Sequence, residues 1–278
     1  MKALYDQVSL RCSKIVTRSY STSFSMGIRL LSSELHDPIY AVYGFVRFAD
    51  EIVDSFHDFD KKELLDRFRL ETYQALEERI SLNPILNSFQ EVVHRYSIER
   101  ELIDAFLHSM EMDLEDREYD QSSFEEYILG SAEVVGLMCL RVFLNGDEAE
   151  YQRLKAPAMK LGSAFQKVNF LRDLKADYEK LGRSYFPDVN LEMFDQMSKQ
   201  EIEADIEADF KEALEGIKEL PRKARFGVYL AYMYYTRLFE KIRNTEPMVI
   251  MQERVRIPNT KKYGLMVGTY FRYRMNLL

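Results

Sequence analysis

Two groups of polar residues, far apart in the chain, repeat nearly the same spacing along segments that are otherwise apolar. The first group is Tyr43, Arg47, Asp50 and Asp54, at positions i, i+4, i+7 and i+11. The second group is Gln166, Asn169, Asp173 and Asp177, at positions i, i+3, i+7 and i+11. Because an α-helix has about 3.6 residues per turn, each group forms one stripe along a helix. The sequence therefore predicts two helices that each carry a row of polar side chains on an otherwise apolar surface.

Carboxylates one helical turn apart are suited to binding hard divalent cations. Such a pair can coordinate Mg²⁺ and leave water and phosphate oxygens to complete the octahedron. Two facing pairs have the charge to hold several Mg²⁺ ions around one or two diphosphates. The metal ions would neutralise a departing diphosphate, so that the remaining organic group ionises to a carbocation. Aromatic side chains would shelter that cation from water, and the chain has 18 Tyr and 18 Phe.

A purely structural role for these acids is the competing hypothesis. With 46 acidic residues among 278, about seven acidic pairs at i,i+4 arise by chance, and most such pairs are solvated. Two buried ion-pair networks between helices would also place charges on apolar segments. The chemical hypothesis is favoured because both pairs align with further polar residues on largely apolar helices. The apolar residues of the first helix are Val42, Val46, Ala49 and Val53 on one stripe, and Phe45, Phe48, Ile52 and Phe56 on the next.

The rest of the sequence predicts an all-α fold. The chain has only 11 Gly and 7 Pro, too few for many short strands, and no repeat or linker divides residues 1–278, which we interpret as one domain. Helix starts are indicated at Asp37-Pro38, Asn83-Pro84, Ser123…Glu126, Asp147…Glu150 and Ser198…Glu201. The predicted helices are 3–17, 38–56, 61–79, 84–95, 98–116, 124–143, 148–179, 198–216 and 221–244.

Two acidic segments outside the stripes are expected to be mainly solvated. The segment 198–220 has Ile202, Ile206 and Phe210 on one stripe, which predicts an exposed amphipathic helix with an acidic outer face. The cluster 111–116 is also interpreted as solvated acids. Neither segment is expected to contribute to the chemistry.

Charge and composition limit the partners and the location. A net charge of −8 argues against nucleic-acid binding, and two cysteines are too few for a disulfide framework. The longest apolar stretch, Val134–Leu144, is shorter than the ~20 residues that span a bilayer. We expect a soluble, cytoplasmic protein. The sequence is also compatible with peripheral contact between this protein and the inner face of the membrane. The segment 270–278 is one candidate for that contact and is equally consistent with a disordered tail, and the oligomeric state is not indicated.

These residues and their neighbours resemble the squalene/phytoene synthase family, the head-to-head prenyl diphosphate synthases, and most of all its bacterial phytoene synthases. The matching segments are Ser21–Phe24, Tyr43–Asp54, Gln166–Asp177 and Gly182–Pro187, within a similarity that runs from about Ser19 to Lys262. The resemblance implies an all-α isoprenoid synthase fold, a single helical domain around a central cavity.

The resemblance also implies a role for each matching residue. The implied Mg²⁺ ligands, which could also bind Mn²⁺, are Asp50, Asp54, Asn169, Asp173 and Asp177. The implied catalytic residues, which contact the diphosphate or assist its departure, are Tyr43, Arg47, Arg172 and Tyr185. The implied substrate-binding residues are Ser21, Ser23, Tyr127, Gln166, Asn169, Arg183 and Arg254. Glu51 stands where many relatives have Asp, and its carboxylate can still accept a hydrogen bond.

The implied reaction joins two prenyl diphosphates head to head. One substrate ionises, its C1 cation attacks the C2–C3 double bond of the other, and the resulting cyclopropylcarbinyl diphosphate ionises and rearranges. We expect two geranylgeranyl diphosphates to give phytoene by proton loss, the first step of carotenoid biosynthesis, without NADPH. The chain has no G-x-G-x-x-G motif, which is weak support for that absence. A squalene or dehydrosqualene synthase that uses farnesyl diphosphate is the alternative.

Two other classes of protein place acids inside helical bundles. A di-iron carboxylate bundle needs two Glu-x-x-His motifs, and the chain offers only Glu91-Val-Val-His94. A non-catalytic helical scaffold would use the acids as structural pairs, and it does not explain polar stripes on two of the most apolar helices.

Overall fold

The all-α prediction is confirmed by the computed structural model, which describes residues 1–115, 119–181, 185–187 and 194–256. These residues form helices and connecting turns with no strand among them. In chain order the elements are α1 (Lys2–Tyr20), α2 (Thr22–Arg29), α3 (Ser33–Ser55), α4 (Lys61–Glu78), α5 (Pro84–Tyr96), α6 (Arg100–Met112), α7 (Gln121–Ile128), the π-helical turn η1 (Leu129–Glu133), α8 (Val134–Leu144), α9 (Glu148–Leu181), α10 (Gln196–Glu219), α11 (Arg222–Arg243) and α12 (Pro247–Ile250).

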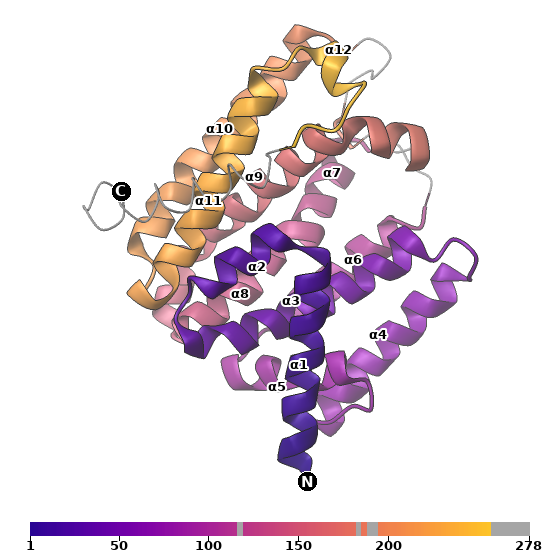
Figure 1. The fold of residues 1–278 in the computed structure, drawn as a ribbon, viewed down its shortest axis with the longest axis vertical. Coiled ribbons are helices and arrows are strands. Elements are labelled where there is room, and N and C mark those ends of the chain that lie inside the picture. The colour runs from indigo at the N-terminus through magenta and orange to yellow at the C-terminus, as the bar shows by residue number, and fades with distance from the viewer. Residues whose placement is uncertain (116–118, 182–184, 188–193, 257–278) are drawn as a thin grey trace.

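The helices pack in two groups that meet along α8 and η1. Figure 1 shows α9, α10 and α11 side by side, and these three helices contact one another. On the other side, α3 contacts α1, α4, α5 and α6. Helix α8 contacts α3 and α6 as well as α9, so it joins the two groups. Helix α8 therefore contacts both α3 and α9, the two helices that carry the predicted stripes.

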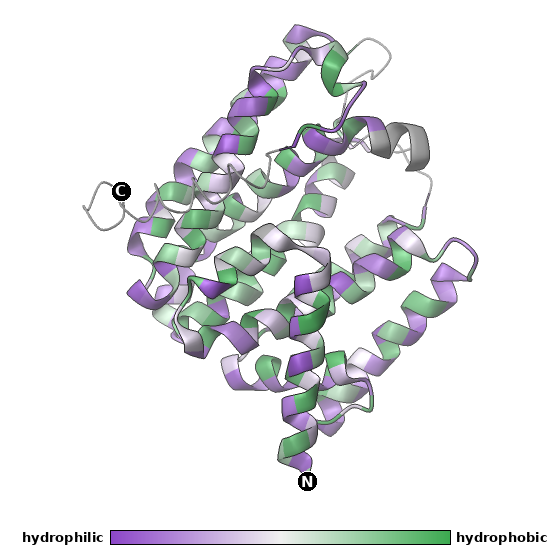
Figure 2. Ribbon diagram, in the orientation of Figure 1, coloured by the Kyte–Doolittle hydropathy of each residue, from purple (hydrophilic) through white to green (hydrophobic). Residues whose placement is uncertain are grey.

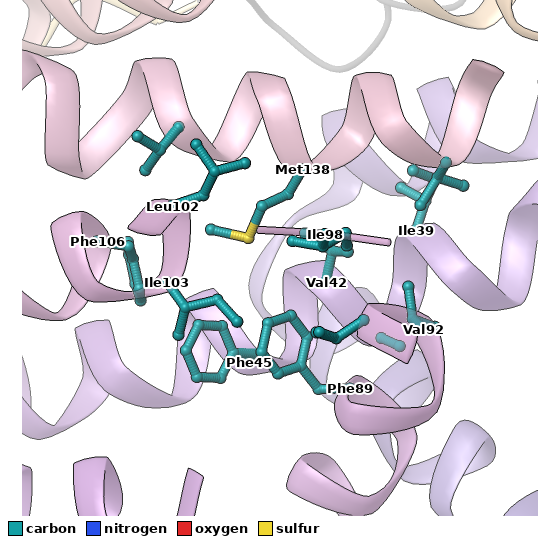
Figure 3. Packing of buried hydrophobic residues seen from close by; sticks show 14 of the residues in the cluster. Ile39, Val42, Phe45, Phe89, Val92, Ile98, Leu102, Ile103, Phe106 and Met138 are labelled. Atoms are coloured by element: carbon teal, nitrogen blue, oxygen red, sulfur yellow. The ribbon is translucent and has the colours of Figure 1, made fainter. Parts of the chain in front are cut away.

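The hydrophobic core that packs against α3 determines which face of α3 points away from the core. The rings of Phe45 and Phe89 stack in parallel with centroids 3.9 Å apart, and Met138 of α8 lies in the same cluster. Figure 3 shows Phe45 and Phe89 side by side beneath Met138. Because Phe45 is fully buried here, residues half a helical turn away are directed out of this core. Those residues include Arg47 and Asp54.

The start of α3 differs from the prediction. The helix begins at Ser33 rather than at Pro38, which lies inside it. A proline there removes one backbone hydrogen bond, so sequence rules favour a helix that starts at the proline. Packing outweighs that loss, because Leu35 in the first turn is 1% exposed and Ser32 N donates to Lys223 O at 2.8 Å.

The predicted caps are partly confirmed. Asn83 caps α5 by accepting from Ile85 N at 3.0 Å, and Asp147 accepts from Glu150 N at 3.2 Å. The boxes that begin at Ser123 and Ser198 were placed wrongly. The actual N-caps are the aspartates three residues earlier, whose carboxylates accept from those two serine N–H groups. An aspartate caps as well as a serine does, so sequence alone left the choice between them open.

The short helices α2 and α12 are elements that the prediction missed. Residues 121–144, which comprise α7, η1 and α8, form one continuous helical segment. The segment is the one described helix long and apolar enough to span a membrane, although the sequence prediction counted only Val134–Leu144. More than half of its most apolar window is buried inside the protein. Arg141 within it pairs with Glu99 and Glu148 and lies over the Tyr151 ring. Because most of this window is buried, we interpret the segment as a core helix of the protein.

The acidic face of α10 is less solvated than predicted. The apolar stripe of Ile202, Ile206 and Phe210 is buried as expected. Asp209, however, is only 2% exposed, and it accepts hydrogen bonds from Lys167 and Ser163 of α9, both at 2.7 Å. Lys160 approaches its other oxygen at 2.9 Å. One acid of this helix therefore belongs to a buried ion-pair network with α9.

Candidate active site

The polar stripe of α3 is organised around Arg47. Its guanidinium donates to both Asp50 and Glu51 and lies over the ring of Tyr20, 4.3 Å from the centroid. The Nε of Arg47 is buried and has no hydrogen-bond partner among the residues that the structure describes. A buried donor without an acceptor is costly, and a phosphate oxygen is an acceptor of the right kind.

The surroundings of Asp50 disfavour the ionised form of its carboxyl group. Burial and the negative charge of Asp54 raise the pKa of Asp50 to about 7, against the opposing effect of Arg47. Asp113 and Glu51 add to the repulsion. Several acids gathered beside one cation have an excess of negative charge, which a divalent cation would relieve.

Tyr43 connects this stripe to the short helix α2. Its ring stacks on Phe24 with centroids 4.7 Å apart, and its phenol is hydrogen-bonded to the side chain of Ser21. Burial raises the pKa of Tyr43, so the phenol stays protonated and can donate. Ser21 also caps α2, accepting from Phe24 N at 3.2 Å. Ser23 lies in α2, and its side chain is outside the described part of the chain.

The stripe of α9 is also paired with arginines. Asp173 accepts from Arg172 at 2.5 Å and from Arg254 at 2.5 Å, so Arg254 lies at the second motif. One turn earlier, Asn169 Nδ2 donates to Gln166 Oε1 at 3.4 Å, and Gln166 donates to Ser131 at 3.3 Å. The side chain of Asp177 and all of Arg183 lie outside the described residues.

Tyr235 of α11 links the two stripes, and the sequence analysis did not identify it. Its hydroxyl donates to Asn169 Oδ1 at 3.3 Å, and its ring stacks on Phe165 with centroids 3.9 Å apart. Its phenol also interacts electrostatically with Tyr43 of α3. The signal available was a run of three tyrosines within four residues, 232, 234 and 235, on an apolar helix.

Asp113 is a further residue of the site, and the sequence analysis wrongly expected it to be solvated. It is 6% exposed rather than solvated, and it accepts from the hydroxyls of Tyr127 at 2.8 Å and Tyr185 at 3.5 Å. The helical period contained the clue, since Asp113 continues the buried stripe of Phe106 and Met110. The prediction for Glu111 was nearer, because this acid is partly exposed and pairs with Lys62 and Arg69.

Tyr127 and Tyr185 form an aromatic wall against Phe170 of α9. Tyr185 stacks on Phe170 of α9 with centroids 4.0 Å apart, and on Tyr127 at 5.2 Å. Burial and the charge of Asp113 raise the pKa of Tyr127 far above its usual value, so its proton is held. The wall can contact a cation through its rings while its hydroxyls are held by Asp113.

An apolar cavity of about 250 Å³ lies between the helix groups. Phe24, Phe165 and Gln166 line it next to the polar stripes, while Leu31, Phe143 and Leu154 line it elsewhere. Glycines let the surrounding helices approach closely. A Cβ added to Gly162 would lie 2.6 Å from Ala132 O, so the backbone of η1 packs directly against α9 at this glycine. The cavity has the apolar character that a hydrocarbon chain requires.

The residues fit a divalent metal that is bound together with a phosphate. No group of three His, Cys, Asp or Glu in the described residues is close enough to form a complete protein site. Mg²⁺ commonly takes only one or two carboxylates from the protein and the rest of its ligands from water and substrate phosphates. Asp50 and Asp54 on α3, and Asn169 and Asp173 on α9, offer oxygens of this kind, and the excess of acids around Asp50 favours a cation.

The fold is the isoprenoid synthase fold. A solved dehydrosqualene synthase superposes with a TM-score of 0.82, covering 97% of this chain and 98% of that one at 19% identity. Squalene synthase HpnC from Alicyclobacillus acidocaldarius superposes with a TM-score of 0.76 over 86% of this chain and 95% of its own, at 21% identity. At these identities the likeness establishes the fold.

The chain belongs to the squalene/phytoene synthase family, whose sequence profile matches residues 17–261. A phytoene synthase of Arthrospira platensis is 26% identical over 89% of this chain and 87% of its own length. Phytoene synthase 3 of Zea mays is 28% identical over 94% of this chain, which spans 65% of that longer protein. A presqualene diphosphate synthase of Rhodopseudomonas palustris is 31% identical over 60% of this chain and 58% of its own. The family predicted from the motifs is thus confirmed, and it is one of prenyltransferase-type enzymes.

Proposed function

We propose that this protein condenses two prenyl diphosphates head to head through a cyclopropylcarbinyl diphosphate, in a reaction that requires Mg²⁺. The observation that supports this most is that one apolar cavity is next to both acid-and-arginine stripes, since it is lined by Gln166 of the α9 stripe and by Phe24, which stacks on Tyr43 of the α3 stripe. Cations at the stripes suit the two diphosphates, and the cavity suits their hydrocarbon chains. A scaffold would not need a buried arginine nitrogen that lacks a partner within the described part of the chain.

The residues of the chain would divide the work between the two diphosphates. Bound Mg²⁺, or Mn²⁺, would neutralise charge on each leaving diphosphate. Arg47 would donate its free Nε–H to one diphosphate, and Arg172 and Arg254 would turn from Asp173 toward the other. The Tyr127 and Tyr185 rings would stabilise the carbocation and exclude water from it.

We propose geranylgeranyl diphosphate as the substrate and phytoene as the product, with no requirement for NADPH. The phytoene synthases of Arthrospira and maize support this choice by their similarity along most of the chain. A 4,4'-diapophytoene synthase of Staphylococcus haemolyticus is 27% identical over 68% of the chain, and this similarity supports the alternative, a synthase that uses farnesyl diphosphate. We place the enzyme in the cytoplasm, in peripheral contact with the membrane.

The test is a product analysis with each substrate. Purified protein is incubated with Mg²⁺ and either geranylgeranyl or farnesyl diphosphate, with and without NADPH, and the hydrocarbons are identified by mass spectrometry. Phytoene from the longer substrate without NADPH is the expected result. A C30 hydrocarbon from the shorter substrate alone would replace the proposal with a squalene or dehydrosqualene synthase, and no hydrocarbon from either would favour the scaffold.

Chain-length preference should respond to the width of the cavity. Cys139 lines it from α8, and its apolar surroundings raise the pKa of the thiol to about 12. We expect Cys139→Phe to lower turnover of geranylgeranyl diphosphate about tenfold more than that of farnesyl diphosphate, because overfilling a packed space costs about 1–3 kcal/mol. Cys139→Ser, of nearly equal volume, is the control. Equal losses with both substrates would show that Cys139 does not limit chain length.

A further inference from the structure

The fully buried residues of helix α1 are polar, which is unusual for a helix that packs on a core. Its inner face consists of Ser9, Ser13 and Thr17, each 0% exposed. These small side chains let α1 pack closely, since a Cβ added to Gly44 of α3 would lie 2.9 Å from Ser13 Oγ. Leu10 packs against the core from one side of this face, but three large apolar residues face outward, with Leu4 63%, Val8 42% and Ile15 63% exposed. Isolated exposed leucines are ordinary, but a helix whose apolar side faces solvent is not.

The outward face is also basic. Leu4, Val8, Arg11, Ile15 and Arg18 follow one another at i, i+4, i+7, i+11 and i+14, which forms a single exposed stripe. The only acid of α1, Asp6, is paired with Lys2 at 2.9 Å and lies off this stripe. The stripe therefore carries positive charge in a chain whose net charge is −8.

The C-terminal end of the stripe leads to the candidate active site. Tyr20, the last residue of α1, is half-exposed and its ring lies under Arg47. Phe24, four residues further, is 36% exposed, stacks on Tyr43 and lines the apolar cavity. Figure 1 shows α1 running along the outside of the helix groups and ending next to α2. A surface that rests on this stripe thus lies beside the cavity.

We infer that the outer face of α1 docks on an anionic membrane surface. Apolar side chains flanked by arginines are the pattern that inserts at the boundary between headgroups and acyl chains. A second copy of the chain fits less well, because a two-fold pairing about the middle of α1 would set Arg11 against Arg11. In Figure 2 the apolar residues of α1 alternate with hydrophilic ones along its exposed length. The choice of a membrane rests in part on the proposed function, since amphiphilic substrates and a hydrocarbon product both partition into lipid.

The test is sedimentation of the full-length protein with vesicles, without substrate. We expect binding to phosphatidylcholine vesicles that contain phosphatidylglycerol, and little binding to phosphatidylcholine alone. Ile15→Asp should lower the affinity at least tenfold, whereas Leu70→Asp, at an exposed leucine on α4, should leave it unchanged. Replacing either Arg11 or Arg18 by Gln should lower the affinity for the anionic vesicles about fivefold and make that affinity less dependent on salt concentration.

Three results would overturn the inference. These are equal binding by wild type and Ile15→Asp, equal binding to both kinds of vesicle, and a dimer in solution that Ile15→Asp dissociates. Turnover of detergent-dispersed substrate separates this inference from the proposed function. Normal turnover without vesicle binding would overturn the inference alone, while vesicle binding without any hydrocarbon product would overturn the proposed function alone. Circular dichroism checks that each variant keeps its helices.

Discussion

Asp50→Asn is expected to lower Mg²⁺-dependent turnover by about 10³-fold, the scale seen when a group that stabilises developing charge is removed. In the proposed mechanism this carboxylate is one of two acids on α3 that would hold a cation, and an amide of the same shape has no charge to hold it. The comparison is Glu51→Gln, one residue away and paired with the same Arg47. Because Glu51 acts on the arginine, its loss should cost only about 10-fold to 100-fold.

The same variant should be more stable than the wild type at neutral pH. Burial and Asp54 raise the pKa of Asp50 to about 7, so the folded protein holds a proton there that the unfolded chain releases near pH 3.8. Stability from this group therefore falls as pH rises from 3.8 to about 7, and asparagine does not undergo that loss. Thermal unfolding with a chelator present measures the difference. Wild-type turnover, or a lower melting temperature above pH 7, would contradict a cation site at Asp50.

Asp209→Asn is expected to destabilise the fold by about 3 kcal/mol, because it leaves buried Lys167 without its buried partner. Asp209 is 2% exposed and joins α10 to Lys160, Ser163 and Lys167 of α9. Burial alone would raise its pKa, but the two lysines and the serine outweigh that effect and lower it. Urea unfolding above pH 5 measures the loss.

Asp205→Asn is the matched control for this network. Asp205 pairs with the same lysine at 2.5 Å, but its side chain is 56% exposed, so its removal should cost less than about 1 kcal/mol. The lowered pKa of Asp209 means that its contribution is present above pH 3.8 and lost at more acidic pH. Equal losses for Asp205→Asn and Asp209→Asn would show that burial does not decide the strength of these pairs.

The polar stripes could be predicted because both depend on local spacing. A 3.6-residue period places Arg47 and Asp50, or Asn169 and Asp173, on one face whatever surrounds the helix. Asp113 and Tyr235 depend instead on which helices meet. Asp113 was one acid in an acidic run, and although the helical period places it on the stripe of Phe106 and Met110, its contact with the tyrosines depends on how the helices pack. The start of α3 was missed for the same reason, since the contact between Leu35 and the core outweighs a local proline signal.

The most direct test of head-to-head condensation is the ratio of diphosphate released to hydrocarbon formed. Wild-type protein is incubated with geranylgeranyl diphosphate and Mg²⁺ until the substrate is consumed, and both products are quantified. Head-to-head condensation predicts two diphosphates for each C40 hydrocarbon, one for each ionisation. Release of diphosphate with only the C20 alcohol as organic product would show that the site ionises a prenyl diphosphate without joining two, and it would contradict the proposed reaction.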